Sequence, residues 1–442
     1  MSLWSFRRVQ PHTLVPQRRW AIGALLGAGV LISFFDRINL SVAAPQLEKA
    51  FAIDAGELGL LLSAFYWPYA VLQIPIGLAV DRFGVTRLGR WGAALWTIAS
   101  ALTAVASGFA GVFAGRALLG IAEAPSFPIV SKATGHWFPR RERARATAIF
   151  DASAKFSNVI GVPLIAFVVV RFGWRWGFGV TSLLSLAYFL AFFAFYRDPS
   201  KDPSLQASER AYIEAGGAVP ESAPGTGSLS MLGYLLSRRQ TWGLAIGFGA
   251  YGYSFYLFLS WLPEYLVKSG GMGILKSAGY AAIPWAVATA TDLAFGGFLI
   301  DAFLAKGANE TRTRKTVLVA GMLLGLAVVG ATRTSSPGWA IFWISISLGG
   351  LAAAAPVGWS LPSLVAPPGA VGAVGGIMNF AVNAMGIAAP IVTGYIYKAT
   401  NSFAGAFLTA AAILVVGIIA FLFLLGPIEP MAPPAAASRA AH

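Results

Sequence analysis

The sequence predicts an all-α membrane protein whose transmembrane helices fall into two bundles of six. Of the 442 residues, 57% are hydrophobic and only 11% are charged. Apolar runs of roughly twenty residues, the length that crosses a bilayer as a helix, recur along the whole chain. One central stretch rich in Pro, Gly, Ser and charge interrupts them and separates the two bundles.

Twelve apolar windows have the length and composition of a membrane-spanning helix. In chain order they lie near residues 20–44, 55–80, 88–108, 110–133, 144–170, 174–196, 240–267, 277–304, 315–333, 337–365, 371–397 and 402–426. The predicted organisation is an N-terminal cytoplasmic segment (1–19), a first bundle (20–196), a cytoplasmic linker (197–239), a second bundle (240–426) and a cytoplasmic tail (427–442).

The basic residues concentrate in alternate loops. The formal charge of +14 would suggest a nucleic-acid partner in a soluble protein. Here the richest basic loops are those before the first window, after the second, fourth and sixth windows, and after the eighth. Because cytoplasmic loops of membrane proteins carry the excess of Lys and Arg, we expect both termini in the cytoplasm, a plasma-membrane location and no nucleic-acid partner. The chain has no cysteine, so it has neither disulfides nor a catalytic thiol.

A short motif follows the second window and reappears in part after the eighth. Its members are Gly77, Asp81, Arg82 and Gly84 in the first half and Gly297 and Asp301 in the second. Related halves around a midplane site are common in secondary transporters. The repetition therefore favours a transport protein.

Four charged side chains lie inside apolar windows: Asp36 and Arg37 in the first, Arg116 and Glu123 in the fourth. Each costs roughly 2.5–3.5 kcal/mol at the bilayer centre, so it should be paired, hydrated or functional. Arg116 and Glu123 are two turns, or roughly 10 Å, apart on one helix face, and Asp36 and Arg37 point about 100° apart.

These residue types suit the exchange of a proton and an anion. A buried carboxylate can change its protonation as its partners move, whereas arginine stays charged and matches a carboxylate with a planar fork of donors. Alternatively, the four residues form a static ion network between helices. Buried ion pairs often stabilise no more than apolar packing does, so the transport interpretation is favoured.

Several stretches resemble the major facilitator superfamily, in particular its anion:cation symporter branch, which includes bacterial sugar-acid/proton symporters, vesicular glutamate transporters and sialin. They are FFDRINLS, SAFYWPYAVLQIPIGLAVDRFG, RALLGIAEAPSFP and GWRWGF. The resemblance covers essentially the whole chain and implies proton coupling by Asp36 and Glu123, with substrate binding by Arg37 and Arg116. It also places the family's helix-two tyrosine at Tyr69 and gating contacts at Asp81 and Arg82.

Further candidate residues lie in later windows. Lys155 either pairs with Asp151 on its own helix or faces the cavity, where it departs from the glutamine common near this position in the resembling symporters and suits a second substrate carboxylate. In the second half the candidate substrate ligands are Asn379, Asn383, Tyr253 and Trp359. For the two amides, bridging of helices is the alternative; for the aromatic residues Tyr251, Tyr253 and Tyr256 it is apolar packing. Asp292 either tethers its helix or moves protons.

The sequence thus predicts a monomeric, cofactor-free symporter that imports a small organic anion, such as a sugar acid, with protons by alternating access. The alternative within transporters is a proton-coupled exporter of amphipathic drugs or cations, which would need a cavity dominated by acids and aromatics. An enzyme is disfavoured because the sequence shows no nucleotide loop, metal cluster or nucleophile constellation, and a sensor because no soluble domain is appended.

Overall fold

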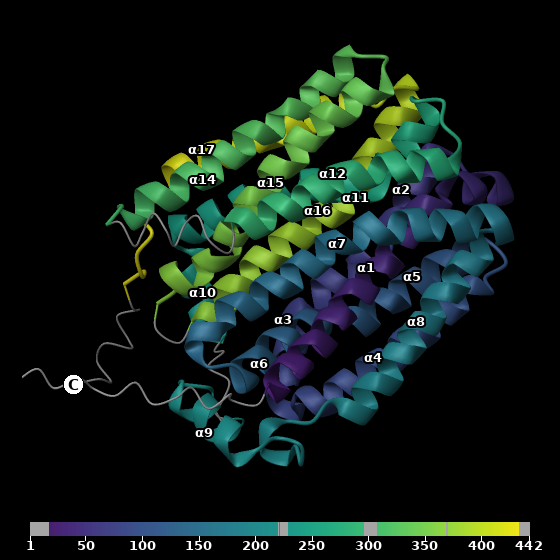
Figure 1. The fold of residues 1–442 in the computed structure, drawn as a ribbon. Coiled ribbons are helices and arrows are strands. Elements are labelled where there is room, and N and C mark those ends of the chain that lie inside the picture. The colour runs from purple at the N-terminus through teal and green to yellow at the C-terminus, as the bar shows by residue number, and fades with distance from the viewer. Residues whose placement is uncertain (1–16, 220, 222–228, 296–306, 368–369, 433–442) are drawn as a thin grey trace, which may run out of the picture.

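The computed structural model describes residues 17–219, 221, 229–295, 307–367 and 370–432. Every regular element in these ranges is a helix, and the long helices run roughly side by side through the molecule (Figure 1). This confirms the predicted all-α class.

The first half comprises α1 (Arg18–Phe51), α2 (Ala55–Ser63), α3 (Tyr66–Phe83), α4 (Val85–Ala104), α5 (Phe109–Glu123), α6 (Ser126–Trp137), α7 (Arg140–Phe172) and α8 (Trp174–Phe195). Between the halves lie the short helices η1 (Pro199–Lys201), α9 (Ala207–Ala215) and α10 (Leu229–Leu236). The second half comprises α11 (Arg239–Lys268), α12 (Ile274–Ala294), α14 (Glu310–Gly325), η3 (Leu326–Arg333), α15 (Pro337–Val365), α16 (Val371–Thr400), α17 (Ala404–Ile419) and η4 (Ala420–Leu424).

Two predicted spans are broken into pairs of shorter helices, which corrects the windows at 55–80 and 110–133. The first becomes α2 and α3, and the second becomes α5 and α6. Pro68 lies in the first turn of α3, and Pro125 lies in the break directly before α6. Because proline has no N–H, neither residue can donate to the carbonyl four positions earlier, so the helix is interrupted there.

The two breaks pack closely against each other. A Cβ placed on Gly120 of α5 would lie 2.1 Å from the backbone oxygen of Phe65, which occupies the break between α2 and α3. Only glycine permits this approach. The contact brings α3 and the end of α5 together near the centre of the first half.

The ends of α1, α8, α11 and η4 define one side of the molecule, which we call the terminal side. The Arg18 guanidinium at the start of α1 donates to the backbone oxygen of Phe195 at the end of α8. Similarly, Gly243 near the start of α11 packs against the backbone of Leu425, directly after η4. The opposite side is called the distal side.

The two halves are joined by ion pairs on the distal side. Lys268 Nζ lies 2.7 Å from Glu48 Oε1, and Lys398 Nζ lies 2.8 Å from Asp54 Oδ2. We call these two pairs the distal latch. The pairing with Lys398 holds the pKa of the Asp54 carboxyl below its usual range, so this part of the latch stays charged at neutral pH.

The terminal side is held together differently. Among the described residues, its recorded ion pairs stay within one half or join that half to α9 and the linker: Arg18 with Asp202, Arg19 with Glu142 and Glu209, and Arg314 with Glu310. The halves are therefore joined by two ion pairs at the distal side, and the other ion pair recorded between them among the described residues, Lys155 with Asp292, is buried between α7 and α12.

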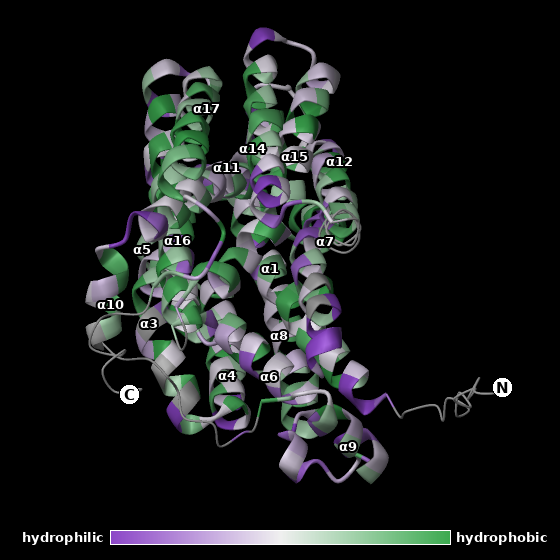
Figure 2. Ribbon diagram, turned by 90° about the vertical axis from the view of Figure 1, so that its left-hand side faces the viewer, coloured by the Kyte–Doolittle hydropathy of each residue, from purple (hydrophilic) through white to green (hydrophobic). Residues whose placement is uncertain are grey.

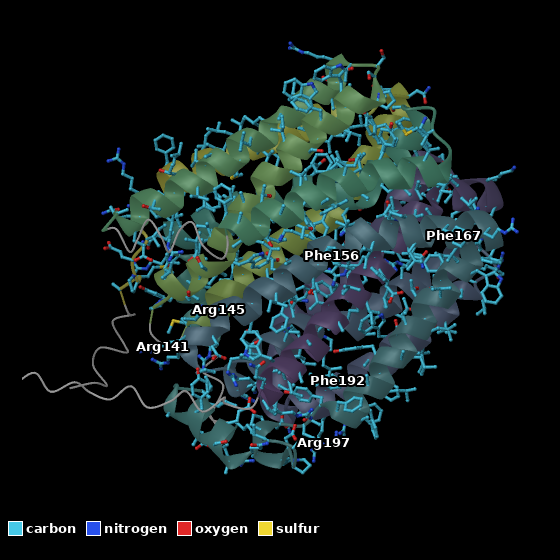
Figure 3. The ribbon with its side chains drawn as sticks, viewed as in Figure 1. Arg141, Arg145, Phe156, Phe167, Phe192 and Arg197 are labelled. Atoms are coloured by element: carbon cyan, nitrogen blue, oxygen red, sulfur yellow. The ribbon has the colours of Figure 1, made fainter. Side chains whose placement is uncertain are left out.

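The outer surface matches a lipid environment. Seven helical stretches of the described chain are long and apolar enough to cross a bilayer, counting α14 with η3 and α17 with η4 as one stretch each. Apolar residues cover much of the helices in Figure 2. Figure 3 shows the basic residues Arg141, Arg145 and Arg197 toward the terminal side, whereas Phe167 lies toward the other end of α7. These three basic residues therefore lie on the terminal side of the molecule, away from Phe167.

Candidate functional site

Arg37 and Glu123 form a buried ion pair at the centre of the first half. The Arg37 guanidinium, from α1, donates from Nη2 and Nε to Glu123 Oε2 at 3.1 and 3.3 Å. Arg37 is 6% exposed and Glu123, at the end of α5, is fully buried. The break after α5 leaves Glu123 as the last residue of its helix, beside the glycine contact described above.

Aromatic rings enclose the Arg37 guanidinium. Its central carbon lies 4.7 Å from the ring centre of Phe34, 4.6 Å from that of Phe65 and 5.0 Å from that of Tyr69. A cation over aromatic faces is attracted by their quadrupoles, so these rings favour the charged form of Arg37 at this position. Tyr69, which the resemblance matches to the family's helix-two tyrosine, therefore lies beside the arginine.

Asp36 points away from Arg37 into the packing between α1, α4 and α8. Its carboxylate accepts hydrogen bonds from Trp96 Nε1 at 2.5 Å, Ser100 Oγ at 2.9 Å and Ser185 Oγ at 3.1 Å. Both of its oxygens are therefore occupied. Asp36 and Arg37 are adjacent in sequence but contact different helices: Asp36 contacts α4 and α8, and Arg37 contacts Glu123 of α5.

Arg116 contacts the backbone of Asp36 and keeps one free donor. Its Nη1 donates to the backbone oxygen of Asp36 at 2.7 Å, and its guanidinium lies 5.7 Å from the Phe65 ring centre. Within the described residues, Arg116 Nε has no hydrogen-bond partner, and neither does Glu123 Oε1. The site thus contains one guanidinium that no carboxylate holds and one carboxylate oxygen that no donor fills.

The second half approaches this cluster through α11 and α16. The rings of Tyr66 and Tyr256 meet across the halves with their centres 4.6 Å apart. Tyr256 donates its hydroxyl to Asn383 Oδ1 at 2.9 Å, and Asn379 Nδ2 donates to Gln73 Oε1 of α3 at 2.8 Å. The two asparagines contact each other as well, through Asn383 Nδ2 and Asn379 Oδ1 at 2.9 Å. In this conformation Asn379 bridges the halves.

Lys155 of α7 belongs to a second buried charge cluster. Its ammonium lies 2.7 Å from Asp151 Oδ2 on the same helix and 3.2 Å from Asp292 Oδ1 on α12. Lys155 is 2% exposed. The pairing with Asp151 along its own helix is therefore present, and a pairing with Asp292 of the opposite half is added to it. The cavity-facing role of Lys155 stays a prediction.

The remaining candidates lie apart from the Arg37 cluster. Tyr253 is buried with no hydrogen-bond partner for its hydroxyl among the described residues. Trp359 is 38% exposed, and its ring packs edge-on against Phe248 at 4.8 Å. Arg82 is exposed at the end of α3 and stacks over Phe83, whereas the Asp81 side chain lies outside the described part of the structure, as do Gly297 and Asp301.

Comparison with known protein families identifies the fold. The family model described as Major Facilitator Superfamily matches residues 26–390. The chain belongs to the major facilitator superfamily. This confirms the predicted twelve-helix fold in two bundles and the assignment as a transporter rather than an enzyme. Within the described ranges, no group of three or more acidic or histidine side chains is arranged to hold a metal ion.

Curated relatives in this superfamily align along nearly the full chain. An uncharacterized transporter of Bacillus subtilis, YybO, is 38% identical over 412 residues, covering 93% of this chain and 95% of the relative. The probable galactarate/D-glucarate transporter GudP of the same organism is 32% identical and covers 96% and 95%. The D-galactonate transporter of Escherichia coli O6:H1 is 30% identical and covers 93% and 97%.

Solved structures of major facilitator proteins share the fold. A bacterial homologue of the human lysosomal transporter Spinster, in an inward-facing and unoccupied conformation, superposes with a TM-score of 0.70 at 18% identity, covering 92% of this chain and 96% of that one. A D-xylose-proton symporter gives 0.69 at 16% identity, covering 93% and 98%.

Sequence reasoning missed several residues that contact the predicted ones. Trp96, Ser100 and Ser185, which hold Asp36, lie in windows where isolated polar atoms carry little signal, although Trp96 and Ser100 share a helix face at a spacing of four. Gln73, the partner of Asn379, follows Tyr69 by one turn and was visible as a polar residue in an apolar window. Contacts between the two halves depend on tertiary structure and cannot be predicted from the residue pattern of a single apolar window.

Proposed function

We propose that this transporter imports a sugar acid, or a closely similar small carboxylate, together with a proton. The observation that carries the proposal is that some polar atoms of the central site have partners while others have none. Arg37 is held by one oxygen of Glu123, the other oxygen is free, and Arg116 retains an unused donor beside them. A proton and an anion can therefore compete for the same ion pair.

The charges around this site set the order of events. Two guanidiniums and two carboxylates, those of Asp36, Arg37, Arg116 and Glu123, sum to zero. A proton on Glu123 Oε1 neutralises that carboxylate, weakens its hold on Arg37 and leaves a net positive site. An entering carboxylate then binds the two guanidiniums with planar, charge-assisted hydrogen bonds and restores neutrality.

Release reverses these steps. When Glu123 loses its proton, its carboxylate again competes for Arg37. The bound anion then loses hydrogen bonds to Arg37 and is held by Arg116 alone. The arrangement of the halves fits this stage, because the two latch pairs join the halves at the distal side, whereas the other recorded ion pair between them among the described residues, Lys155 with Asp292, is buried between α7 and α12. If the terminal side is cytoplasmic, this conformation delivers substrate to the cytoplasm.

Two relatives support the choice of substrate class. One is named for galactarate and D-glucarate and another for D-galactonate, all polyhydroxylated carboxylates. In this chain, Tyr69 lies beside Arg37, Gln73 follows Tyr69 by one turn of α3, and Asn379 binds Gln73. Such hydroxyl and amide groups suit the hydroxyls of a sugar acid.

Substitution of Glu123 by Gln tests the proposal. In liposomes, E123Q should retain exchange of internal for external sugar acid and lose accumulation driven by a proton gradient, because glutamine cannot gain or lose the coupling proton. The matched control is Glu214→Gln on the exposed face of α9, which should behave as the natural protein. Undiminished proton-driven accumulation by E123Q would contradict the proposal.

A further inference from the structure

The cluster of Lys155, Asp151 and Asp292 is negative overall. One ammonium is shared by two carboxylates, 2.7 and 3.2 Å away, which leaves one negative charge in excess. Lys155 and Asp292 are 2% and 3% exposed. An excess charge in such a place is costly, so the cluster has a strong reason to bind a proton.

This cluster lies closer to the terminal side than Arg37 does, along the packed helices α1 and α7. On the terminal side, Gly27 of α1 packs against Ser153 of α7; further toward the distal side, Gly161 of α7 packs against Ile38. Helices α1 and α7 therefore run parallel, and Arg37 is level with about residue 160 of α7. Lys155 lies roughly 7–8 Å closer to the terminal side, at 1.5 Å of rise per residue.

Aromatic side chains of α11 connect the two levels. Tyr256, which meets the first half beside Arg37, is followed toward the terminal side by Phe255 and Tyr251, with ring centres 5.4 and 5.9 Å apart along the row. Tyr251 is 5% exposed. The charged groups recorded at the Lys155 ammonium are Asp151 from α7 and Asp292 from α12, and the uncharged Tyr251 of α11 lies at the same level.

We infer that the cluster of Lys155, Asp151 and Asp292 binds a second substrate carboxylate together with a second proton, so that the substrate is a sugar diacid. The inference rests on the proposed function and narrows its substrate class. A proton taken up by the carboxylate pair makes the cluster neutral. The far carboxylate of the diacid then replaces an aspartate beside Lys155 while the near one binds Arg37 and Arg116.

The position of Asp292 gives this exchange a mechanical consequence. Asp292 belongs to the second half and Lys155 to the first, and α7 packs along α12. Release of this ion pair by a diacid frees one contact between the halves. A sugar monoacid, which has a neutral hydroxymethyl group at its far end, has no charge with which to replace Asp292.

Binding of two acids that differ only at the far end tests the inference. The probes are a six-carbon aldaric acid and the aldonic acid of the same configuration, titrated by calorimetry into the full-length protein in detergent. The natural protein should bind the diacid at least about tenfold more tightly, as expected for an added charge-assisted contact. Lys155→Gln should abolish this preference and keep monoacid affinity, whereas the exposed control Lys276→Gln should leave both unchanged.

Proton uptake provides a second readout. Titrations in buffers of different ionisation enthalpy should show one more proton taken up with the diacid than with the monoacid. Asp292→Asn leaves Lys155 neutralised by Asp151 alone and should remove that difference. This variant also tests the inference if Lys155→Gln does not fold.

The outcomes distinguish failure of the second carboxylate site from failure of the proposed function. The second site would be overturned if Lys155→Gln kept the preference for the diacid, or if the two acids caused equal proton uptake. It would also be overturned if the natural protein bound the monoacid more tightly. In each case the cluster would be only a tether between helices. Failure of the natural protein to bind either acid would instead overturn the proposed function itself.

Discussion

At the scale of single residues, the two central acids have different roles despite similar burial. Asp36 accepts three hydrogen bonds from side chains of α4 and α8, whereas Glu123 has one ion-pair partner and one free oxygen. The sequence placed both acids in membrane helices and could treat them only as equals. From these hydrogen-bond partners we propose that Glu123 exchanges the coupling proton and that Asp36 anchors α1.

The anchor predicts a stability cost for Asp36→Asn. An amide presents one acceptor oxygen and turns its NH₂ group toward hydroxyl and indole donors, so at least one buried donor loses its partner. We expect the free energy of unfolding to fall by about 1–3 kcal/mol. Thermal unfolding in detergent measures the change. Glu123→Gln should be clearly milder, and equal losses in the two variants would argue against an anchoring role for Asp36.

At the scale of elements, the breaks between α2 and α3 and between α5 and α6 position the central site. They were not predicted, because hydrophobic windows measure length and composition and continue across a break in a buried helix. Pro68 and Pro125 were visible, yet proline is common within membrane helices that stay continuous, as Pro163 in α7 shows. The decisive contact, Gly120 against the Phe65 backbone, joins segments far apart in sequence.

The packing of these breaks predicts a strong effect for Gly120→Ala. The new methyl group would meet the backbone oxygen of Phe65, which cannot rotate away as a side chain does. We expect α5 to be displaced from α3, with a loss of about 1–3 kcal/mol in unfolding free energy and impaired substrate binding. Gly77→Ala is the matched control, because its added methyl group would meet nothing within 4 Å. If both variants melt and bind alike, the close approach is unimportant.

At the scale of the whole molecule, the twelve-helix fold, its division into halves and the pairing of Arg37 with an acid were within reach of the sequence. Membrane spans are set by composition, and a buried charge demands a partner. Which charges meet across the halves was out of reach. The contact of Lys155 with Asp292 and that of Lys268 with Glu48 depend on how two rigid bundles are placed in one state of a cycle.

The distal latch predicts how that placement can be shifted. Lys268 lies 2.7 Å from Glu48 across the halves and 3.1 Å from Glu264 on its own helix, and Glu264 is 1% exposed. Lys268→Gln removes the bridge and leaves two carboxylates close together without a cation. If the bridge stabilises the closed distal side by about 1.4 kcal/mol, its removal should shift the population roughly tenfold toward a state open on that side, because each 1.4 kcal/mol changes a population ratio tenfold.

Pairs of spin labels measure this shift directly. The chain has no cysteine, so cysteines introduced at the exposed positions Ala50 and Lys276 would be the only labelling sites. In Lys268→Gln the distance between the labels should lengthen. Adding Glu264→Gln should restore part of the short distance, because it removes the carboxylate left without a cation within its half. An unchanged distance in the single variant would show that apolar packing between α1 and α11, rather than charge, closes the distal side.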